Sequence, residues 1–162
     1  MISAATRAKA TLGDSAELVG NFVASQLNSD GGFKSRDGRS DLYYTSFGID
    51  CFVALDLELP KDRIISYLRS FYQDESLDLV HFACLVRSLE NIQSGSSQEL
   101  LDIVPASRLE KLTSLVQSVY ECFLMIALCH DLCMEIPDKE QMMSFINSMH
   151  ANEAASPMIQ VL

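Results

Sequence analysis

A repeated short amphipathic helix constrains this fold more than any other feature of the sequence. Ile64–Phe71 reads IISYLRSF, and Met142–Met149 reads MMSFINSM 78 residues later. Each copy follows a tetrapeptide that ends in proline, LELP in the first and MEIP in the second. Leu18–Leu27 and Arg108–Ser118 fit the same kind of polar-faced helix. The chain is therefore predicted to be a stack of repeated helical units.

Longer and more apolar helices are predicted between the amphipathic ones. Apolar residues recur with helical periodicity, and clusters of Gly, Pro, Asp and Ser punctuate the chain. The predicted helices span residues 15–27, 41–57, 61–72, 76–92, 108–117, 118–134 and 138–150. An amphipathic and an apolar helix make one pair roughly every 39 residues. This alternation predicts an all-α fold of stacked helical hairpins, because a single hairpin cannot bury its own apolar face.

The chain is expected to divide into three segments. These are an N-terminal lead-in at 1–14, a repeat domain at 15–154 and a C-terminal tail at 155–162. Within the domain the apolar helices should form an inner layer, and the amphipathic helices an outer layer that water reaches on one side. Ser40 or Asp41 should cap the apolar helix that begins near residue 41.

Composition and charge exclude several classes of protein. Of the 162 residues, 48% are hydrophobic and 21% are charged, which is typical of a globular domain. The net charge of −10 argues against nucleic acid as a partner, because phosphates repel such a chain. No apolar run approaches the roughly 20 residues of a membrane span, and no secretory signal is evident, so we expect a cytoplasmic protein. The five cysteines, an odd number in apolar helical patterns, should be reduced core thiols.

The stretch Gln26–Leu55 carries a more specific pattern, in which a glycine-rich aromatic turn precedes a polar loop and an apolar helix. It reads QLNSDGGFKSRDGRSDLYYTSFGIDCFVAL. This pattern resembles one repeat of the prenyltransferase β-subunit and squalene (terpene) cyclase family, and most of all the protein prenyltransferase branch. The resemblance implies an α/α toroid, a ring of concentric helical hairpins around an apolar cavity. The chain has enough hairpins for just over half a ring, so a partial ring is expected.

The resemblance also directs a search for the chemistry of the family. In protein prenyltransferases, zinc is held by the Asp and Cys of a D-x-C motif and the His of a D-x-x-H-T motif. The sequence DLYYT (Asp41–Thr45) can be aligned with either motif but lacks a ligand of each. Tyr43 stands at the Cys position of the first motif, and Tyr44 at the His position of the second. A phenol with a pKa of about 10 is a poor zinc ligand. The acidic D-x-D-D motif of the cyclases does not occur. No catalytic residue, metal ligand or cofactor is therefore expected, and zinc would bind only if another chain supplied ligands.

Several residues are nevertheless candidates for binding a ligand in the cavity or at its mouth. They are Arg36, Arg39, Asp41, Tyr43, Tyr44, Phe47 and His81. The arginines could hold a diphosphate, although a solvated loop is the simpler interpretation. The histidine, in LVHFACLV, could be a general base, although no acidic partner is obvious and a core or cavity histidine is simpler. Likewise, Cys129 and Cys133 could share a helical face as metal ligands, but core packing is simpler.

Three functions are compatible with the resemblance. The first is a non-catalytic repeat domain for binding or assembly. The second is a divergent or truncated prenyltransferase β-like subunit that transfers an isoprenoid from its diphosphate, so the question of enzyme activity stays open. The third is a carrier for an isoprenoid or another apolar small molecule. A partial ring exposes apolar helices, so a second copy or a partner chain is expected to complete it.

Overall fold

A computed structural model of the chain describes residues 12–13, 15–93, 104, 106–114 and 116–154. This part is predominantly helical, which confirms the all-α class. The helices are α2 (Ser15–Ser25), α3 (Leu42–Leu55), α4 (Lys61–Arg69), α5 (Leu79–Gln93), α7 (Ala106–Ser114), α8 (Val119–Asp131) and α9 (Lys139–Ala154); the strands are β1 (Phe33–Lys34) and β2 (Ser40–Asp41). The predicted tail, almost all of the predicted lead-in and most of the connection at 94–107 lie outside the described residues.

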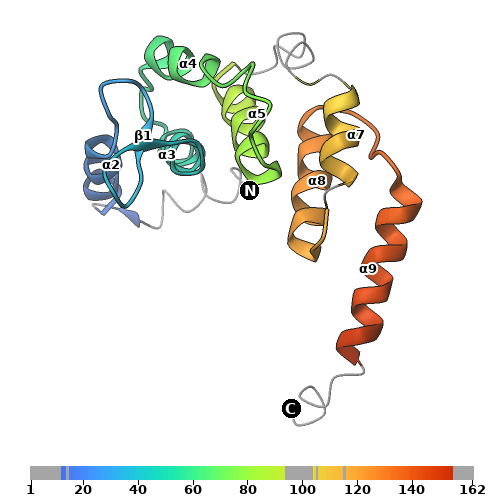
Figure 1. Ribbon diagram of the computed structural model, residues 1–162. Coiled ribbons are helices and arrows are strands. Elements are labelled where there is room, and N and C mark those ends of the chain that lie inside the picture. Colours follow the sequence, from blue (N-terminus) through green and yellow to red (C-terminus); the bar gives the residue numbers. More distant parts are fainter. Residues whose placement is uncertain (1–11, 14, 94–103, 105, 115, 155–162) are drawn as a thin grey trace.

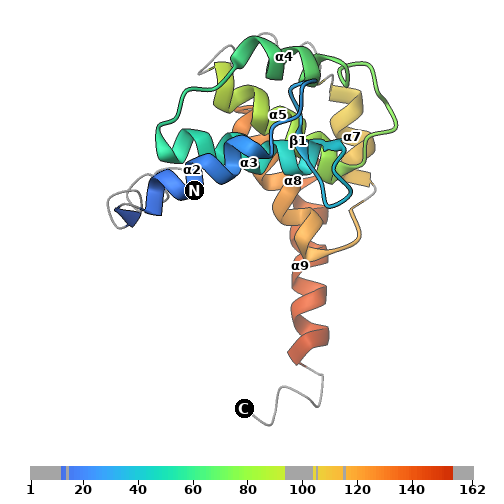
Figure 2. The same ribbon diagram turned by 90° about the vertical axis from the view of Figure 1, so that its left-hand side faces the viewer.

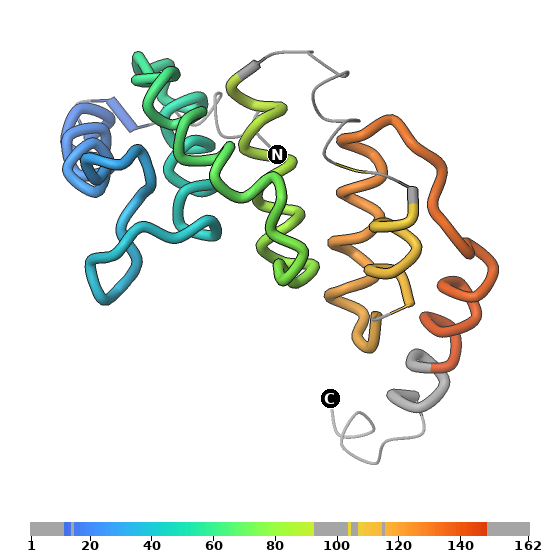
Figure 3. Tube along the Cα trace, turned by 45° about the horizontal axis from the view of Figure 1, so that its top comes forward, coloured from blue at the N-terminus to red at the C-terminus, as the bar shows by residue number. Residues whose placement is uncertain are grey.

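The helices extend across the molecule from α2 at one side to α9 at the other, with α8 between α5 and α7 (Figure 1 and Figure 3). Helix α3 packs against α5, and α5 packs against α8. The remaining contacts place α2 on α3, α4 on α5 and α9 on α8. The three apolar helices α3, α5 and α8, named the central helices from here on, thus form one continuous layer. In Figure 2, α9 extends well beyond the other helices.

Local capping residues decide where the central helices begin and end. Asp41 is the N-cap of α3, since its carboxylate accepts a hydrogen bond from the Tyr44 backbone N–H. Ser118 caps α8 in the same way, and Glu121 completes a capping box by accepting from the Gln117 N–H and the Ser118 hydroxyl. At the other end of α3, Asp56 adopts the left-handed conformation (φ 55°) that commonly ends a helix.

Several predicted helix ends differ from the structure by a few residues, and the difference at the end of α8 changes the placement of a cysteine. Helix α8 ends at Asp131 rather than at residue 134. Cys133 lies beyond it with φ 52°, and its N–H bonds to the His130 carbonyl. Because the backbone turns left-handed there, Cys133 is exposed and does not share a helical face with the buried Cys129. The two thiols are therefore not the i, i+4 pair expected from the sequence.

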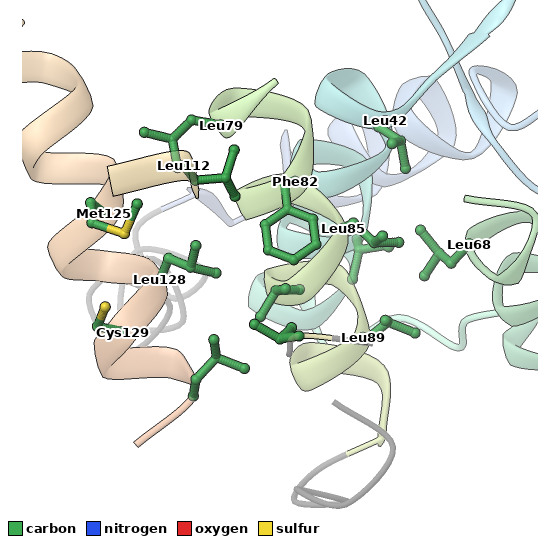
Figure 4. Packing of buried hydrophobic residues seen from close by; sticks show 14 of the residues in the cluster. Leu42, Leu68, Leu79, Phe82, Leu85, Leu89, Leu112, Met125, Leu128 and Cys129 are labelled. Atoms are coloured by element: carbon green, nitrogen blue, oxygen red, sulfur yellow. The ribbon is translucent and has the colours of Figure 1, made fainter. Parts of the chain in front are cut away.

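The hydrophobic core lies along α5. Phe82, Leu85 and Leu89 are fully buried. Figure 4 shows them with Leu68 of α4 on one side and side chains of α8, among them Met125, on the other. A buried aromatic or leucine side chain contributes about 1.5–3 kcal/mol of hydrophobic free energy. Helix α5 therefore packs against both α3 and α4 on one side and α8 on the other.

Candidate functional site

The glycine turn positions the start of α3. The N–H of Phe33 donates to the Thr45 hydroxyl at 2.9 Å, and that hydroxyl donates to the Asp41 carbonyl at 2.6 Å. The Phe33 ring is buried and meets the Phe52 ring edge-on, with 5.8 Å between centroids. A Cβ on Gly48 would lie 2.4 Å from the Phe33 ring, so glycine is required where the ring crosses α3. The turn thereby holds Asp41 at a defined place at the end of the helix.

Asp41 faces a histidine from the neighbouring central helix. The His81 Nε2 atom lies 3.8 Å from the Asp41 Oδ2 atom. The other ring nitrogen, Nδ1, lies 2.8 Å from the Asp78 Oδ1 atom, and the same carboxylate accepts from the His81 backbone N–H. Burial alone would raise the pKa of Asp78, but these hydrogen bonds from His81 outweigh it and lower the pKa. An imidazole is thus held between two carboxylates at the N-terminal ends of α3 and α5.

The central helices carry a cluster of exposed aromatic side chains, here named the aromatic face. It consists of Tyr43 and Phe47 on α3, which are 37% and 50% exposed, and Tyr120 and Phe123 on α8, which are 53% and 58% exposed. The rings of Tyr43 and Phe47 meet edge-on with 4.8 Å between centroids. Partial burial, and then the nearby Tyr43 and Cys84, raise the pKa of Tyr120. The tyrosines of α3 and α8 are therefore neighbours across α5.

Cys84 lies between the two aromatic pairs on α5, where its environment suppresses nucleophilic reactivity. Burial raises the pKa of its thiol to about 11, although a hydrogen bond with Ser46 acts in the opposite direction. A thiol with so high a pKa carries little thiolate at neutral pH, and the thiolate is the reactive form. Cys84 is therefore part of the surface between the aromatic side chains rather than a nucleophile.

Carboxylates gather toward the C-terminal ends of the central helices, at a cluster here named the acidic end. Asp50 of α3 accepts from Arg87 Nε at 3.3 Å and from Asn91 Nδ2 at 2.7 Å. Burial raises the pKa of Asp50 despite Arg87, and Asp131 of α8 adds to the rise. Burial and then Asp131 also raise the pKa of Glu90. The carboxylates of Asp50 and Glu90 are thus both influenced by that of Asp131.

The candidate ligand residues predicted from the sequence fall into two groups. Asp41 and His81 come together, and so do Tyr43 and Phe47, all on the central helices. Tyr44 is half-buried against the core. Arg36 and Arg39 lie instead on the exposed loop between β1 and β2, where Arg39 Nη2 lies 2.6 Å from Asp37 Oδ2.

The residues present do not make up a zinc site by themselves. Asp41 and His81 offer two donors, whereas a catalytic zinc site has about three protein ligands. In the part of the chain that the structure describes, no three His, Cys, Asp or Glu side chains group as metal ligands would. Tyr43 and Tyr44, which follow Asp41, are poor zinc ligands and do not supply the third one. Asp41 and His81 would therefore need at least one further ligand to hold zinc.

Sequence reasoning missed two contacts of this region. Asp78 partners His81, a pairing that its i, i+3 spacing and its place before an apolar helix could have signalled. Arg108 of α7 donates to the Asp74 carbonyl at 2.6 Å and lies over the Phe82 ring. No local pattern in the sequence indicates the second contact, because its partners are more than twenty residues away.

A cavity of about 180 Å³ lies away from the aromatic face, between α7, α8 and α9. Its lining includes Thr113, Val116, Met142 and Phe145. Ligand pockets in proteins usually measure about 300–1,000 Å³. This cavity is therefore small for an isoprenoid.

Comparisons with known proteins give no relative: no family model, curated protein or solved structure matches this chain. Among the described helices, none is both long and apolar enough to cross a membrane. Functional inference therefore rests on the side chains of the central helices.

Proposed function

We propose that this chain is a non-catalytic helical-repeat domain of the prenyltransferase and squalene cyclase type, and that its central helices bind another protein chain in an assembly. The aromatic face carries this proposal. Phe47, Tyr120 and Phe123 are each at least half exposed, although they lie on the most apolar helices. Large apolar side chains that stay exposed together in this way are typical of interaction sites.

Two further observations support a partial toroid without catalysis. The central helices pack side by side with amphipathic helices beside them, which is the arrangement that the resemblance implies for an α/α ring. The D-x-Y-Y-T sequence at the start of α3 has tyrosines at the Cys and His positions of the family's zinc motifs. A ring that is left open at its inner helices needs another chain to cover them.

Site-specific photocrosslinking tests this proposal. A photoreactive phenylalanine analogue at position 123 should crosslink to a second chain in cells, while the same analogue at Lys111, on the exposed side of α7, should not. The captured chain is then purified and must bind the unmodified protein in a reconstituted pair. Equal crosslinking at both positions, or none at position 123, would contradict the proposal.

The enzyme hypothesis, a divergent prenyltransferase β-like subunit, makes a different demand. It requires bound zinc and protection from unfolding by a prenyl diphosphate, both in the presence of whatever chain completes the metal site. The carrier hypothesis requires an enclosed cavity larger than the one between α7 and α9. Both are tested by thermal unfolding with geranylgeranyl diphosphate, with and without zinc, and a non-catalytic assembly domain should show no shift.

A further inference from the structure

The charges around the aromatic face are distributed unevenly. Asp41 and Asp78 lie at one end of it, beside His81. The acidic end (Asp50, Glu90 and Asp131) lies at the other. Arg87 is the permanent cation among these groups, and it is already paired with Asp50 at 3.3 Å. The histidines His81 and His130 each face aspartates. The aromatic face is therefore an apolar centre between two negative ends.

The arrangement of the helices concentrates this charge. Asp41 meets His81 at the N-terminal ends of α3 and α5, and Asp50 meets Asn91 toward their C-terminal ends, so the two helices run in the same direction. Helix α8 runs in the same direction as α5, because Met125 lies toward the same end as Phe82, and Cys129 toward the same end as Leu89 (Figure 4). The C-terminal end of a helix dipole is negative and favours cations. Asp131, the last residue of α8, is therefore placed where a carboxylate is unfavourable.

The cluster at the acidic end is unfavourable for the isolated chain. Asp50 and Glu90 come from different helices yet lie near the same Asp131, and like charges repel when they are partly desolvated. Cations supplied by a partner would relieve this repulsion. A second copy of the chain would not, since each copy carries a net charge of −10. An anionic membrane would be repelled for the same reason.

We infer that the central helices bind a cationic amphipathic segment of another protein, whose apolar side chains cover the aromatic face and whose Lys and Arg residues meet the carboxylates at its two ends. This inference rests on the proposed function and names the partner's chemistry. Asp41 and Asp50 are nine residues apart, which is about 14 Å along a helix. The partner's cations should therefore be separated by a similar distance, with aromatic or aliphatic residues between them.

Binding of designed peptides to the full chain tests the inference. The probe is a fluorescein-labelled amphipathic peptide of Leu and Lys, and the matched peptides replace every Lys with Glu or with Gln. Fluorescence anisotropy at low salt should show binding of the Lys peptide only, and added salt should weaken it. Hydrogen exchange on the complex should show protection of α3 and α8 amides beyond that of the free protein.

Matched variants distinguish binding to the carboxylates of this face from attraction to the net charge of the chain. Glu90→Gln with Asp131→Asn removes two carboxylates from the acidic end, whereas Asp62→Asn with Glu110→Gln removes two exposed ones from α4 and α7. Circular dichroism first establishes that each pair is folded. The first pair should weaken binding about tenfold or more, because close charge pairs across an interface contribute strongly to affinity. The second pair should change it less than twofold.

Each other outcome overturns the inference, and the outcomes differ in what they leave standing. Equal weakening by both pairs would show attraction to net charge alone. Binding of the Gln peptide but not the Lys peptide, with crosslinking from position 123, would leave the proposed function in place with a neutral partner. A dimer in light scattering that crosslinks through position 123 would make a second copy the occupant. If no peptide binds and position 123 does not crosslink, both proposals fail.

Discussion

The guanidinium carbon of Arg108 lies 4.2 Å from the centroid of the Phe82 ring. Arg108 lies in the first turn of α7 and also donates to the backbone carbonyls of Tyr72 and Asp74, in the connection after α4. Partial burial lowers the pKa of the guanidinium, although Glu75 and Asp74 oppose this effect. The Arg108 side chain thus links α7, the connection after α4, and α5, where it stacks on the buried Phe82 ring.

Replacing Arg108 should destabilise the fold more than its charge alone would suggest. Arg108→Lys keeps the charge but loses the planar fork and the stacking on Phe82, so we expect a loss of about 1–2 kcal/mol in the free energy of unfolding. Urea denaturation measures it. Arg39→Lys, on the exposed loop, serves as the control and should leave the free energy of unfolding nearly unchanged. Equal effects of the two substitutions would contradict the role of the Phe82 ring.

Gly48→Ala should be destabilising through the Phe33 ring. The added Cβ would lie 2.4 Å from that ring, which must then move away from α3. Overpacking of this kind costs about 1–3 kcal/mol, measured by thermal unfolding. A double variant with Phe33→Leu should recover part of the loss, because a smaller side chain leaves room for the methyl group. No recovery would indicate that the helix backbone, rather than the ring, is the limiting contact.

Truncation of Phe82 should lower the stability of the fold, whereas truncation of Phe123 should weaken partner binding instead. Phe82 is 0% exposed and Phe123 is 58% exposed. Phe82→Ala should lower the free energy of unfolding by about 3–5 kcal/mol, whereas Phe123→Ala should change it by less than about 1 kcal/mol. Partner crosslinking from the neighbouring position 120 should nonetheless fall in Phe123→Ala. A large stability loss in Phe123→Ala would show that this ring belongs to the core.

Stability should depend on the charge of Glu90. Burial raises the pKa of Glu90 from 4.5, so its charged form is less favourable in the folded state than in the unfolded state. Its contribution to stability is therefore present below pH 4.5 and is lost as the pH rises through the higher folded pKa. Glu90→Gln should remove this decline. Urea denaturation of both proteins between pH 4 and pH 7 measures the difference, and parallel curves would contradict it.

Asp78 should give the opposite dependence. Its pKa is lowered from 3.8, because hydrogen bonds from His81 outweigh the effect of burial. The contribution of Asp78 to the free energy of unfolding is present above pH 3.8. It is lost as the pH falls through the lowered pKa of the folded state. Asp78→Asn should flatten the acid side of the stability curve. A curve that keeps its full steepness below pH 4 would show that other carboxylates dominate acid unfolding.

The sequence was sufficient for the order and type of the helices, because apolar periodicity sets which residues a helix buries. Seven predicted helices correspond to seven described ones, and Asp41 caps α3 as expected. Helix ends were harder to predict. Residues 76–78 fit a helical pattern, but α5 begins at Leu79 because the Asp78 side chain accepts a hydrogen bond from the His81 N–H.

The candidate site was predictable only in part, because several of its contacts join residues that are far apart in the sequence. Tyr43 and Phe47 lie four residues apart on α3, and helical spacing groups them, while Asp41 was predictable as the cap of the same helix. The approach of Tyr120 to Tyr43 and of Asp131 to Glu90 depends on how α5 and α8 pack, which no local pattern encodes. The exposure of Phe123 depends on what covers the central helices, and the sequence of one chain does not contain that information.

The contact between Gly31 and α4 has a consequence for how the chain reaches its fold. Gly31 has φ 97°, and a Cβ at this position would lie 2.3 Å from the Arg63 carbonyl oxygen. The turn is therefore completed by a helix that comes about thirty residues later in the sequence. Since the same turn also holds the Phe33 ring against α3, the strands β1 and β2, α3 and α4 should open and close as one cooperative unit in hydrogen exchange. A fragment that ends after α3 would therefore lack the α4 backbone against which Gly31 packs.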